Sequence, residues 1–67
     1  MTPNGAAIRV IRQLRGFGLR QLAERIGTNP SHVSRIEREE RGASDDIVQR
    51  IADALDVPPD AITREKQ

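Results

Sequence analysis

The chain of 67 residues has no cysteine, tryptophan or tyrosine, and Phe17 is its only aromatic residue. Without cysteine there is no disulfide and no thiolate metal site, and a single histidine cannot hold a metal alone, so we expect no metal and no cofactor. So few aromatic residues argue against a β-sandwich or barrel and against a surface that stacks single-stranded bases. The length suits one small domain, which must be stabilised by an aliphatic core.

Long hydrophobic runs are missing as well. No segment approaches the roughly 20 apolar residues of a membrane span. No apolar segment follows Met1 to serve as a signal peptide, so we expect a cytoplasmic protein. The sequence also shows no Ser-His-Asp set, no phosphate-cradling glycine loop and no carboxylate pair suited to acid–base catalysis, and we therefore expect no enzyme.

The net charge of +1 conceals an asymmetry between the two halves of the chain. Up to Arg38 there are seven arginines and two glutamates, a balance of +5, whereas the residues from Glu39 onward carry four basic and eight acidic side chains, a balance of −4. Ten of the eleven basic residues are arginine, whose planar guanidinium suits two-pronged contact with phosphate or a base edge. The first half is therefore predicted to present a surface that attracts anions.

Apolar residues recur at helical spacing in five short segments. The first helix is predicted to follow an Asn4 N-cap and to stop at Gly16. The second is predicted to begin at Leu19 and to end at Gly27, where the chain must reverse and glycine permits a positive φ.

The third helix is predicted to run from Pro30 to about Arg38, with Asn29 as its N-cap and proline in its first position. Val33 and Ile36 carry its apolar stripe, and its opposite face is polar. Together with the preceding helix it has the layout of a helix-turn-helix, in which the second helix of the pair enters the major groove of DNA.

A fourth helix is predicted to be capped by Ser44 and broken by Pro58, and a fifth to begin at Pro58 or Pro59 and to include Ile62. The expected fold is a compact all-α bundle of five helices in one domain. That domain is expected to span residues 1–67, with a core over about 5–63 and a frayed tail over 64–67.

Three stretches carry a resemblance to a known family: residues 22–27 (LAERIG), 33–38 (VSRIER) and 51–57 (IADALDV). With these in order, the chain from Ile8 to Ile62 resembles the Xre/Cro-type helix-turn-helix domains of phage repressors, plasmid regulators and restriction-modification controllers. The resemblance implies a lambda-repressor-like fold whose second and third helices form the helix-turn-helix.

The resemblance further implies sequence-specific binding of double-stranded DNA by a transcriptional regulator, with repression as the default. The chain would act as a homodimer on a palindromic operator, joined through the fourth and fifth helices around Val57 to Ile62. It would be encoded by a bacterium, phage or plasmid and would lie in the cytoplasm on nucleoid DNA.

The resemblance also implies that the candidate base contacts fall on the exposed side of the third helix, at Pro30, Ser31, Ser34 and Arg35. Arg35 is the strongest candidate, because its fork matches the O6 and N7 atoms of guanine. Ser31 can donate or accept, although it could instead satisfy a local backbone group. Pro30 offers only apolar contact, for example to a thymine methyl, and Ser34 is a weaker candidate on the same side.

Candidate phosphate contacts come from the start of the second helix, the start of the third and the connector that follows it: Leu19, Arg20, Asn29, His32, Arg41 and Gly42. The first turn of a helix offers free N–H groups and a dipole that favours an anion. Arg20 and Arg41 could equally be solubilising charges, and His32 could be an ordinary surface residue or a partner of the helix cap.

In the family that the chain resembles, an arginine of the first helix pairs with the glutamate that ends the third, and Arg12 and Glu37 occupy these positions. Such a pair would fix the angle of the third helix against the first. By contrast, Arg9, Arg15 and Arg25 are expected on solvated faces.

The chain departs from the family pattern at several positions. Leu19 replaces a glutamine that clamps phosphate, Gly18 replaces a Ser or Thr cap, and Glu39 replaces a glycine. Glu39 and Glu40 also place negative charge near the expected DNA backbone. Together with Leu19 they support an alternative function, in which the chain is a protein-interaction module that docks RNA polymerase or another regulator through its helix-turn-helix or its acidic surface.

Overall fold

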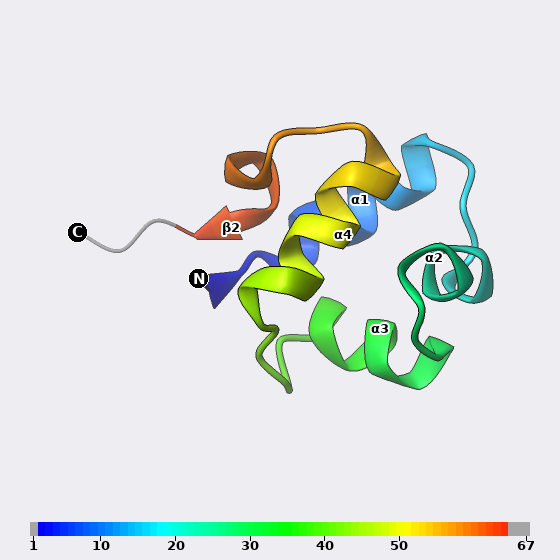
Figure 1. The fold of residues 1–67 in the computed structure, drawn as a ribbon, viewed down its shortest axis with the longest axis horizontal. Coiled ribbons are helices and arrows are strands. Elements are labelled where there is room, and N and C mark those ends of the chain that lie inside the picture. The colour runs from blue at the N-terminus through cyan, green and yellow to red at the C-terminus, as the bar shows by residue number, and fades with distance from the viewer. Residues whose placement is uncertain (1, 65–67) are drawn as a thin grey trace.

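The computed structural model describes residues 2–64, and their elements are arranged around one core (Figure 1). The elements are β1 (Thr2–Pro3), α1 (Gly5–Leu14), α2 (Leu19–Ile26), α3 (Pro30–Glu37), α4 (Asp45–Leu55), the 3-10 turn η1 (Pro59–Ile62) and β2 (Thr63–Arg64). These residues contain four α-helices, so the expected count of five is wrong. The last predicted helix is a single 3-10 turn, because the chain leaves Pro58 in an extended conformation and extends again into β2 after only four residues.

The helix starts follow from their cap residues. The side-chain oxygen of Asn4 accepts from the Ala7 N–H at 3.1 Å. The Ser44 hydroxyl likewise accepts from the Ile47 N–H at 3.2 Å. Asn29 caps α3 in the same way, and Gly16 and Gly27, just after α1 and α2, have φ values of +80° and +78°. The predicted starts and stops of these helices are therefore confirmed.

The core is aliphatic, as the scarcity of aromatic residues requires. In Figure 1, α3 lies along the lower edge, α2 at the right, and α4 crosses the centre in front of α1. Eleven side chains that are at most 2% exposed fill the space between these helices and η1: Ile8, Leu22, Ala23, Ile26, Val33, Ile36, Val48, Ile51, Ala52, Leu55 and Ile62. They come from the stripes that the helical spacing predicts.

Two short antiparallel strands join the beginning and the end of the described chain. Thr2 pairs with Arg64 and Pro3 with Thr63, and the N–H that follows β1 donates to the Ile62 carbonyl at 2.8 Å. Arg64 is thus a strand residue, so its place in the expected frayed tail is wrong, and the rest of that tail, 65–67, lies outside the described residues. No local sequence pattern predicts that residues so far apart in the chain pair with each other.

The Glu39 side chain links the end of α3 to the start of α1 and to β2. Its carboxylate oxygen Oε2 accepts from the Gly5 N–H at 2.9 Å and from Arg64 Nη2 at 2.7 Å. The bond from Arg64, and after it the bond from Gly5, hold the pKa of the Glu39 carboxyl below its ordinary value. Glu39 itself has a φ of +60°, the left-handed region that costs a non-glycine residue about 1–2 kcal/mol.

Gly5 is required where the start of α1 meets the end of α3. A Cβ built on Gly5 would lie 2.1 Å from the Glu37 carbonyl oxygen and 2.8 Å from that of Ile36. Both of these atoms belong to the backbone, so neither can move aside as a flexible side chain could. The close approach of the two helices therefore depends on the absence of a side chain at this position.

Replacing Gly5 by alanine should destabilise the fold by about 3 kcal/mol, although alanine is the better helix former, because the added methyl group overlaps the backbone of α3. Urea unfolding followed by circular dichroism measures the change. Gly42→Ala is the matched control: a Cβ there meets nothing within 4 Å, and stability should change by less than about 0.5 kcal/mol. Equal effects of the two substitutions would show that the approach of α1 to α3 is not tight.

Candidate nucleic-acid interface

The helices α2 and α3 are joined by a tight turn of three residues, and α3 turns one face to solvent (Figure 1). Val33 and Ile36 of α3 are fully buried against the core. From α4, Arg50 Nη1 donates to the Ile26 carbonyl at 3.1 Å and so satisfies the end of α2. Because about 3.6 residues make one helical turn, burial of this stripe leaves the polar residues of α3 on the opposite side.

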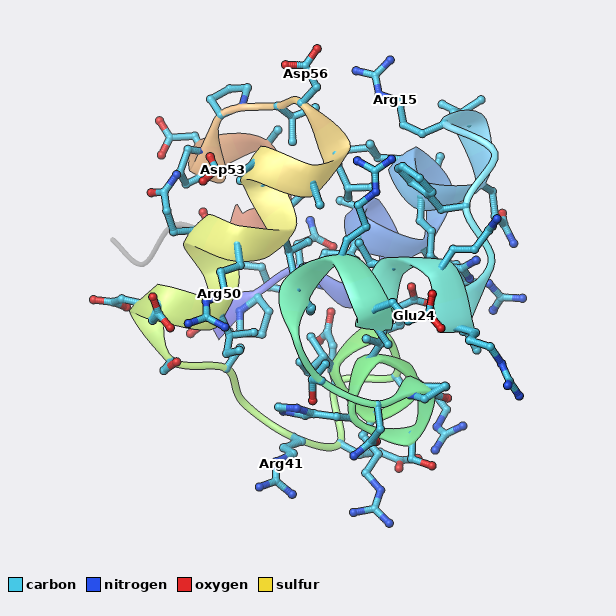
Figure 2. All side chains as sticks on the ribbon, turned by 45° about the vertical axis from the view of Figure 1, so that its right-hand side comes forward. Arg15, Glu24, Arg41, Arg50, Asp53 and Asp56 are labelled. Atoms are coloured by element: carbon cyan, nitrogen blue, oxygen red, sulfur yellow. The ribbon has the colours of Figure 1, made fainter. Side chains whose placement is uncertain are left out.

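An open hollow of about 410 Å³ lies beside the first turns of α3 and is lined by Asn29, Ser31, His32, Arg35 and Arg41. The two arginines are exposed, and no carboxylate is among the lining residues. Figure 2 shows Arg41 pointing away from the body of the domain beside α3. We call this the His32 hollow, and its charge and hydrogen-bond donors suit an anionic ligand.

His32 is oriented from the turn that precedes it. Its ring nitrogen Nδ1 lies 2.9 Å from the Thr28 hydroxyl oxygen, and its backbone N–H donates to the Asn29 side chain at 2.9 Å. When Nδ1 accepts the hydroxyl proton, the ring carries its own proton on Nε2, which can then donate to a ligand. Thr28 is thus part of the site, although its place in the turn gave no sign of this.

A second hollow, of about 240 Å³, lies on the other flank of α3, where α1, α2 and α3 meet. It is lined by Arg9, Arg12, Leu19, Ser34, Glu37 and Arg38. We call it the Arg9 hollow. The first turn of α2 opens at its edge, and there the Gly18 N–H donates to Gln21 Oε1 at 2.7 Å in place of a side-chain cap. The exposed ridge of α3 therefore runs between two hollows that contain arginine.

Arg12 and Glu37 form a buried ion pair between α1 and α3. Arg12 Nε donates to Glu37 Oε2 at 2.6 Å and Nη2 to Oε1 at 3.1 Å, and the two side chains are only 8% and 6% exposed. The third nitrogen, Nη1, donates to the Phe17 carbonyl at 2.8 Å. All three nitrogens of the guanidinium therefore have partners, as a buried charge requires.

Along the exposed side of α3, Arg38 links Ser34 to Glu40. Arg38 Nη1 donates to Ser34 Oγ at 2.9 Å, and its Nε and Nη2 donate to the two carboxylate oxygens of Glu40 at 3.0 and 3.2 Å. The Ser34 hydroxyl, which accepts from Arg38, keeps its own proton free to donate outward.

Most of the candidate contact residues line one of the two hollows. Ser31, His32, Asn29, Arg35 and Arg41 share the His32 hollow, whereas Leu19 and Ser34 line the Arg9 hollow. The remaining candidates stand outside both linings: Pro30, which is half-buried, and Arg20 and Gly42, which are exposed. The Asn29 side-chain oxygen Oδ1 accepts from the His32 N–H in capping α3, which leaves the N–H groups of the side-chain amide for a ligand.

Two residues of this surface, Arg9 and Arg38, were not among the candidates. Arg9 was expected on a solvated face, and it lies one turn before Arg12, while Arg38 follows Glu37 directly. The pairing of Arg12 with Glu37 therefore already implies that these two arginines are neighbours. Two other expected solvated residues are exposed but have specific partners: Arg15 Nε donates to the Leu55 carbonyl at 2.8 Å, and Arg25 lies 4.9 Å from the centre of the Phe17 ring.

Among residues 2–64, no three potential metal ligands gather into a group. No helix in this part of the chain combines the length and the apolar character that crossing a membrane requires. The polar surface on both flanks of α3 is thus the feature that needs a functional explanation.

A sequence model of the helix-turn-helix family matches residues 8–62. No curated protein matches the chain. Among solved structures, the chain is similar to the restriction-modification controller protein C.AhdI from Aeromonas hydrophila. The two are 32% identical with a TM-score of 0.82, and the match covers 85% of this chain and 86% of that one.

Two further similar structures are complexes with DNA. SinR, a master regulator for biofilm formation, is 31% identical with a TM-score of 0.79, and the match covers 85% of this chain and 95% of that one. The chain is also similar to the solution structure of the N-terminal DNA-binding domain of SinR from Bacillus subtilis. The P22 c2 repressor in complex with a synthetic operator has a TM-score of 0.87 over 98% of this chain and 100% of that one, and at 21% identity this likeness concerns the fold alone.

Replacing Arg12 by alanine should lower the free energy of unfolding by about 3–5 kcal/mol, because it leaves the buried Glu37 carboxylate without its partner. Urea unfolding gives the value. Arg38→Ala is the control on an exposed pair and should cost less than about 1 kcal/mol. A double replacement, Arg12→Met with Glu37→Leu, should recover most of the loss. Equal effects of Arg12→Ala and Arg38→Ala would contradict a locking role for Arg12 and Glu37.

Proposed function

The chain belongs to the Xre/Cro-type helix-turn-helix family, and from that membership we propose that it is a transcriptional regulator that binds double-stranded DNA sequence-specifically, with repression as its default action. One observation carries the proposal: the exposed ridge of α3 is flanked by two arginine-bearing hollows. A helix in the major groove has a phosphate backbone on either flank, which is where this surface offers positive charge. The expected location is accordingly the cytoplasm, on nucleoid DNA.

In this proposal α3 reads the bases. Arg35 donates its two-pronged fork to guanine, and Ser31 donates to or accepts from a neighbouring base. Ser34 acts as a donor, since its oxygen already accepts from Arg38. Pro30 packs against a thymine methyl at the start of the helix. These contacts form a short, rigid row, because the Asn29 cap and the packing of α3 fix its position.

The two hollows would hold the phosphates. On one flank, His32 Nε2 and the exposed Arg41 would donate to a phosphate, with the Asn29 amide and the Gly42 backbone beside them. On the other flank, the N–H groups of the first turn of α2, at Leu19 and Arg20, would meet the second strand together with Arg9 and Arg38. Contacts of this kind set the position of the domain on the duplex and carry no sequence information by themselves.

One domain offers only a few base contacts, so we propose that two copies act together on a palindromic operator. Two α3 helices would then occupy half-sites about 34 Å apart on one face of the duplex. The segment from Val57 to Ile62 is the proposed dimer contact, and its exposed residues would form it, because Ile62 itself is buried in the core. It includes the half-buried Val57 and the exposed Pro58, which line a shallow hollow with Ala52, Asp53 and Asp56.

The alternative of a protein-interaction module rested on Leu19, Glu39 and Glu40. Leu19 packs against the core and is only partly exposed. Glu39 is engaged with Gly5 and Arg64, and Glu40 with Arg38. Because each of the three has a partner within the domain, they support a docking surface less well than they did as isolated sequence features, and DNA binding is the function favoured here.

Binding to a duplex measured across a salt series tests this function. A protein that contacts DNA phosphates releases the counterions bound to them. The logarithm of the association constant K should therefore fall linearly with the logarithm of the salt concentration, with a slope of about 0.9 for each phosphate contact. Selection from random duplexes should then yield a palindromic consensus, which tests sequence reading and the dimer together. Binding that does not respond to salt and has no preferred sequence would favour the interaction module.

Arg35→Ala should lower the ratio of specific to non-specific affinity by about fivefold to 150-fold, because a two-pronged guanine contact contributes about 1–3 kcal/mol of discrimination. Competition between the selected duplex and a scrambled one gives this ratio. Arg41→Ala, from the same hollow, is the matched control and should weaken both affinities alike. If Arg35→Ala also weakened both alike, Arg35 would be a phosphate contact.

A further inference from the structure

The acidic residues that follow α3 have different surroundings, although they are adjacent and of the same type. The Glu39 carboxylate turns toward α1 and β2, where it accepts from Gly5 and Arg64. The Glu40 carboxylate instead meets Arg38, whose guanidinium reaches back one turn to Ser34 and therefore lies along the exposed side of α3. Glu40 therefore places its charge on the flank of α3 that holds Arg38 and the Arg9 hollow, whereas Glu39 lines a separate hollow with Thr2, Pro3, Arg41 and Gly42.

The ion pair of Arg38 with Glu40 uses the donors that a phosphate would need. Arg38 Nε and Nη2 form one edge of the guanidinium fork, and each donates to a different oxygen of Glu40, at 3.0 and 3.2 Å. Carboxylate and phosphate bind this edge of an arginine with the same two-pronged geometry. A phosphate at this position must therefore compete with Glu40 for the same two N–H groups.

Glu40 lowers the positive charge that the Arg9 hollow presents to a DNA strand. Among its lining residues, Arg12 is neutralised by Glu37 inside the domain. Arg9 and Arg38 remain as its two outward cations, and Glu40 neutralises Arg38 from outside. Within residues 2–64, the Arg9 hollow thus offers a DNA strand one arginine without a carboxylate partner when Glu40 is in place, and it would offer two without Glu40.

The ion pair of Arg38 with Glu40 is also exposed enough for Arg38 to exchange Glu40 for another anion. The side chains of Arg38 and Glu40 are 57% and 56% exposed, in contrast to the buried pair of Arg12 and Glu37. Exposed pairs hold their partners weakly and respond to salt. Arg38 can therefore leave Glu40 for a phosphate, but the freed carboxylate then lies near the DNA backbone and repels it.

We propose that Glu40 is a built-in competitor for a DNA phosphate at Arg38, and that it sets the affinity of the domain for any duplex below the level its arginines would give. The proposal rests on the proposed DNA-binding function and adds a residue that tunes it. Because the competition concerns a phosphate, its effect should be the same for the operator and for unrelated sequences.

Glu40→Gln tests the competition, since it keeps the shape of the side chain and removes its charge. Anisotropy of a labelled random-sequence duplex, titrated with the full chain across a salt series, should show binding about three- to tenfold tighter at low salt. The slope of log K against log salt should steepen by about 0.9, the value of one additional phosphate contact. Melting followed by circular dichroism should confirm that the variant is folded.

Two comparisons separate this contact from a general change of charge. Glu24→Gln alters the net charge equally, and Glu24 is exposed on α2, lines neither hollow and lies outside the proposed dimer contact, so the slope should not change. In an Arg38→Ala background, Glu40→Gln should no longer steepen the slope.

The outcomes are distinct. Equal effects of Glu40→Gln and Glu24→Gln, or an effect of Glu40→Gln that survives the loss of Arg38, would overturn the proposal. If the original chain binds the duplex in a salt-dependent way and Glu40→Gln changes nothing, the competition alone is wrong. If neither chain binds duplex DNA, the proposed function fails and this inference fails with it.

Discussion

The buried ion pair between Arg12 and Glu37 is the interaction on which the surface of this domain depends. It joins α1 to the end of α3 through two hydrogen bonds, and the third nitrogen of Arg12 holds the Phe17 carbonyl, so three segments meet at one guanidinium. Arg9 stands one turn before Arg12, and Arg38 stands next to Glu37. The outward charges that form the Arg9 hollow are therefore positioned by a buried charge pair, and the tilt of α3 is fixed along with them.

The arginines of this chain divide into two groups that their sequence positions do not distinguish. Arg12, Arg15 and Arg50 donate to partners inside the domain, and two of them satisfy the carbonyl groups at the ends of α4 and α2. Figure 2 shows Arg15 beside Asp56 at one end of the domain and Arg41 at the other. A charge balance taken over halves of the chain therefore overstates the charge available to a ligand. What matters is the smaller set that lines the two flanks of α3.

Helical spacing and cap residues were sufficient to predict α1 to α4, because burial of an apolar stripe and satisfaction of the first N–H groups are local demands. The partner of Arg12 came only from the family resemblance, since spacing does not pair residues of different helices. The roles of Gly5 and Glu39 could not be predicted, because they depend on backbone atoms brought together from distant parts of the chain.

The pairing of β1 with β2 makes the described chain nearly a closed ring. Thr2 lies opposite Arg64, and the hydrogen bond from Asn4 to Ile62 continues the contact inward. Figure 1 shows the beginning of the chain and β2 leaving the domain at the same edge. Because Thr2 and Arg64 are adjacent, residues 2–64 could be carried as an insertion within a surface loop of another protein, with short connections and little disturbance of either partner. The same geometry would tolerate a circular permutation that links residue 64 to residue 2 and opens the chain elsewhere.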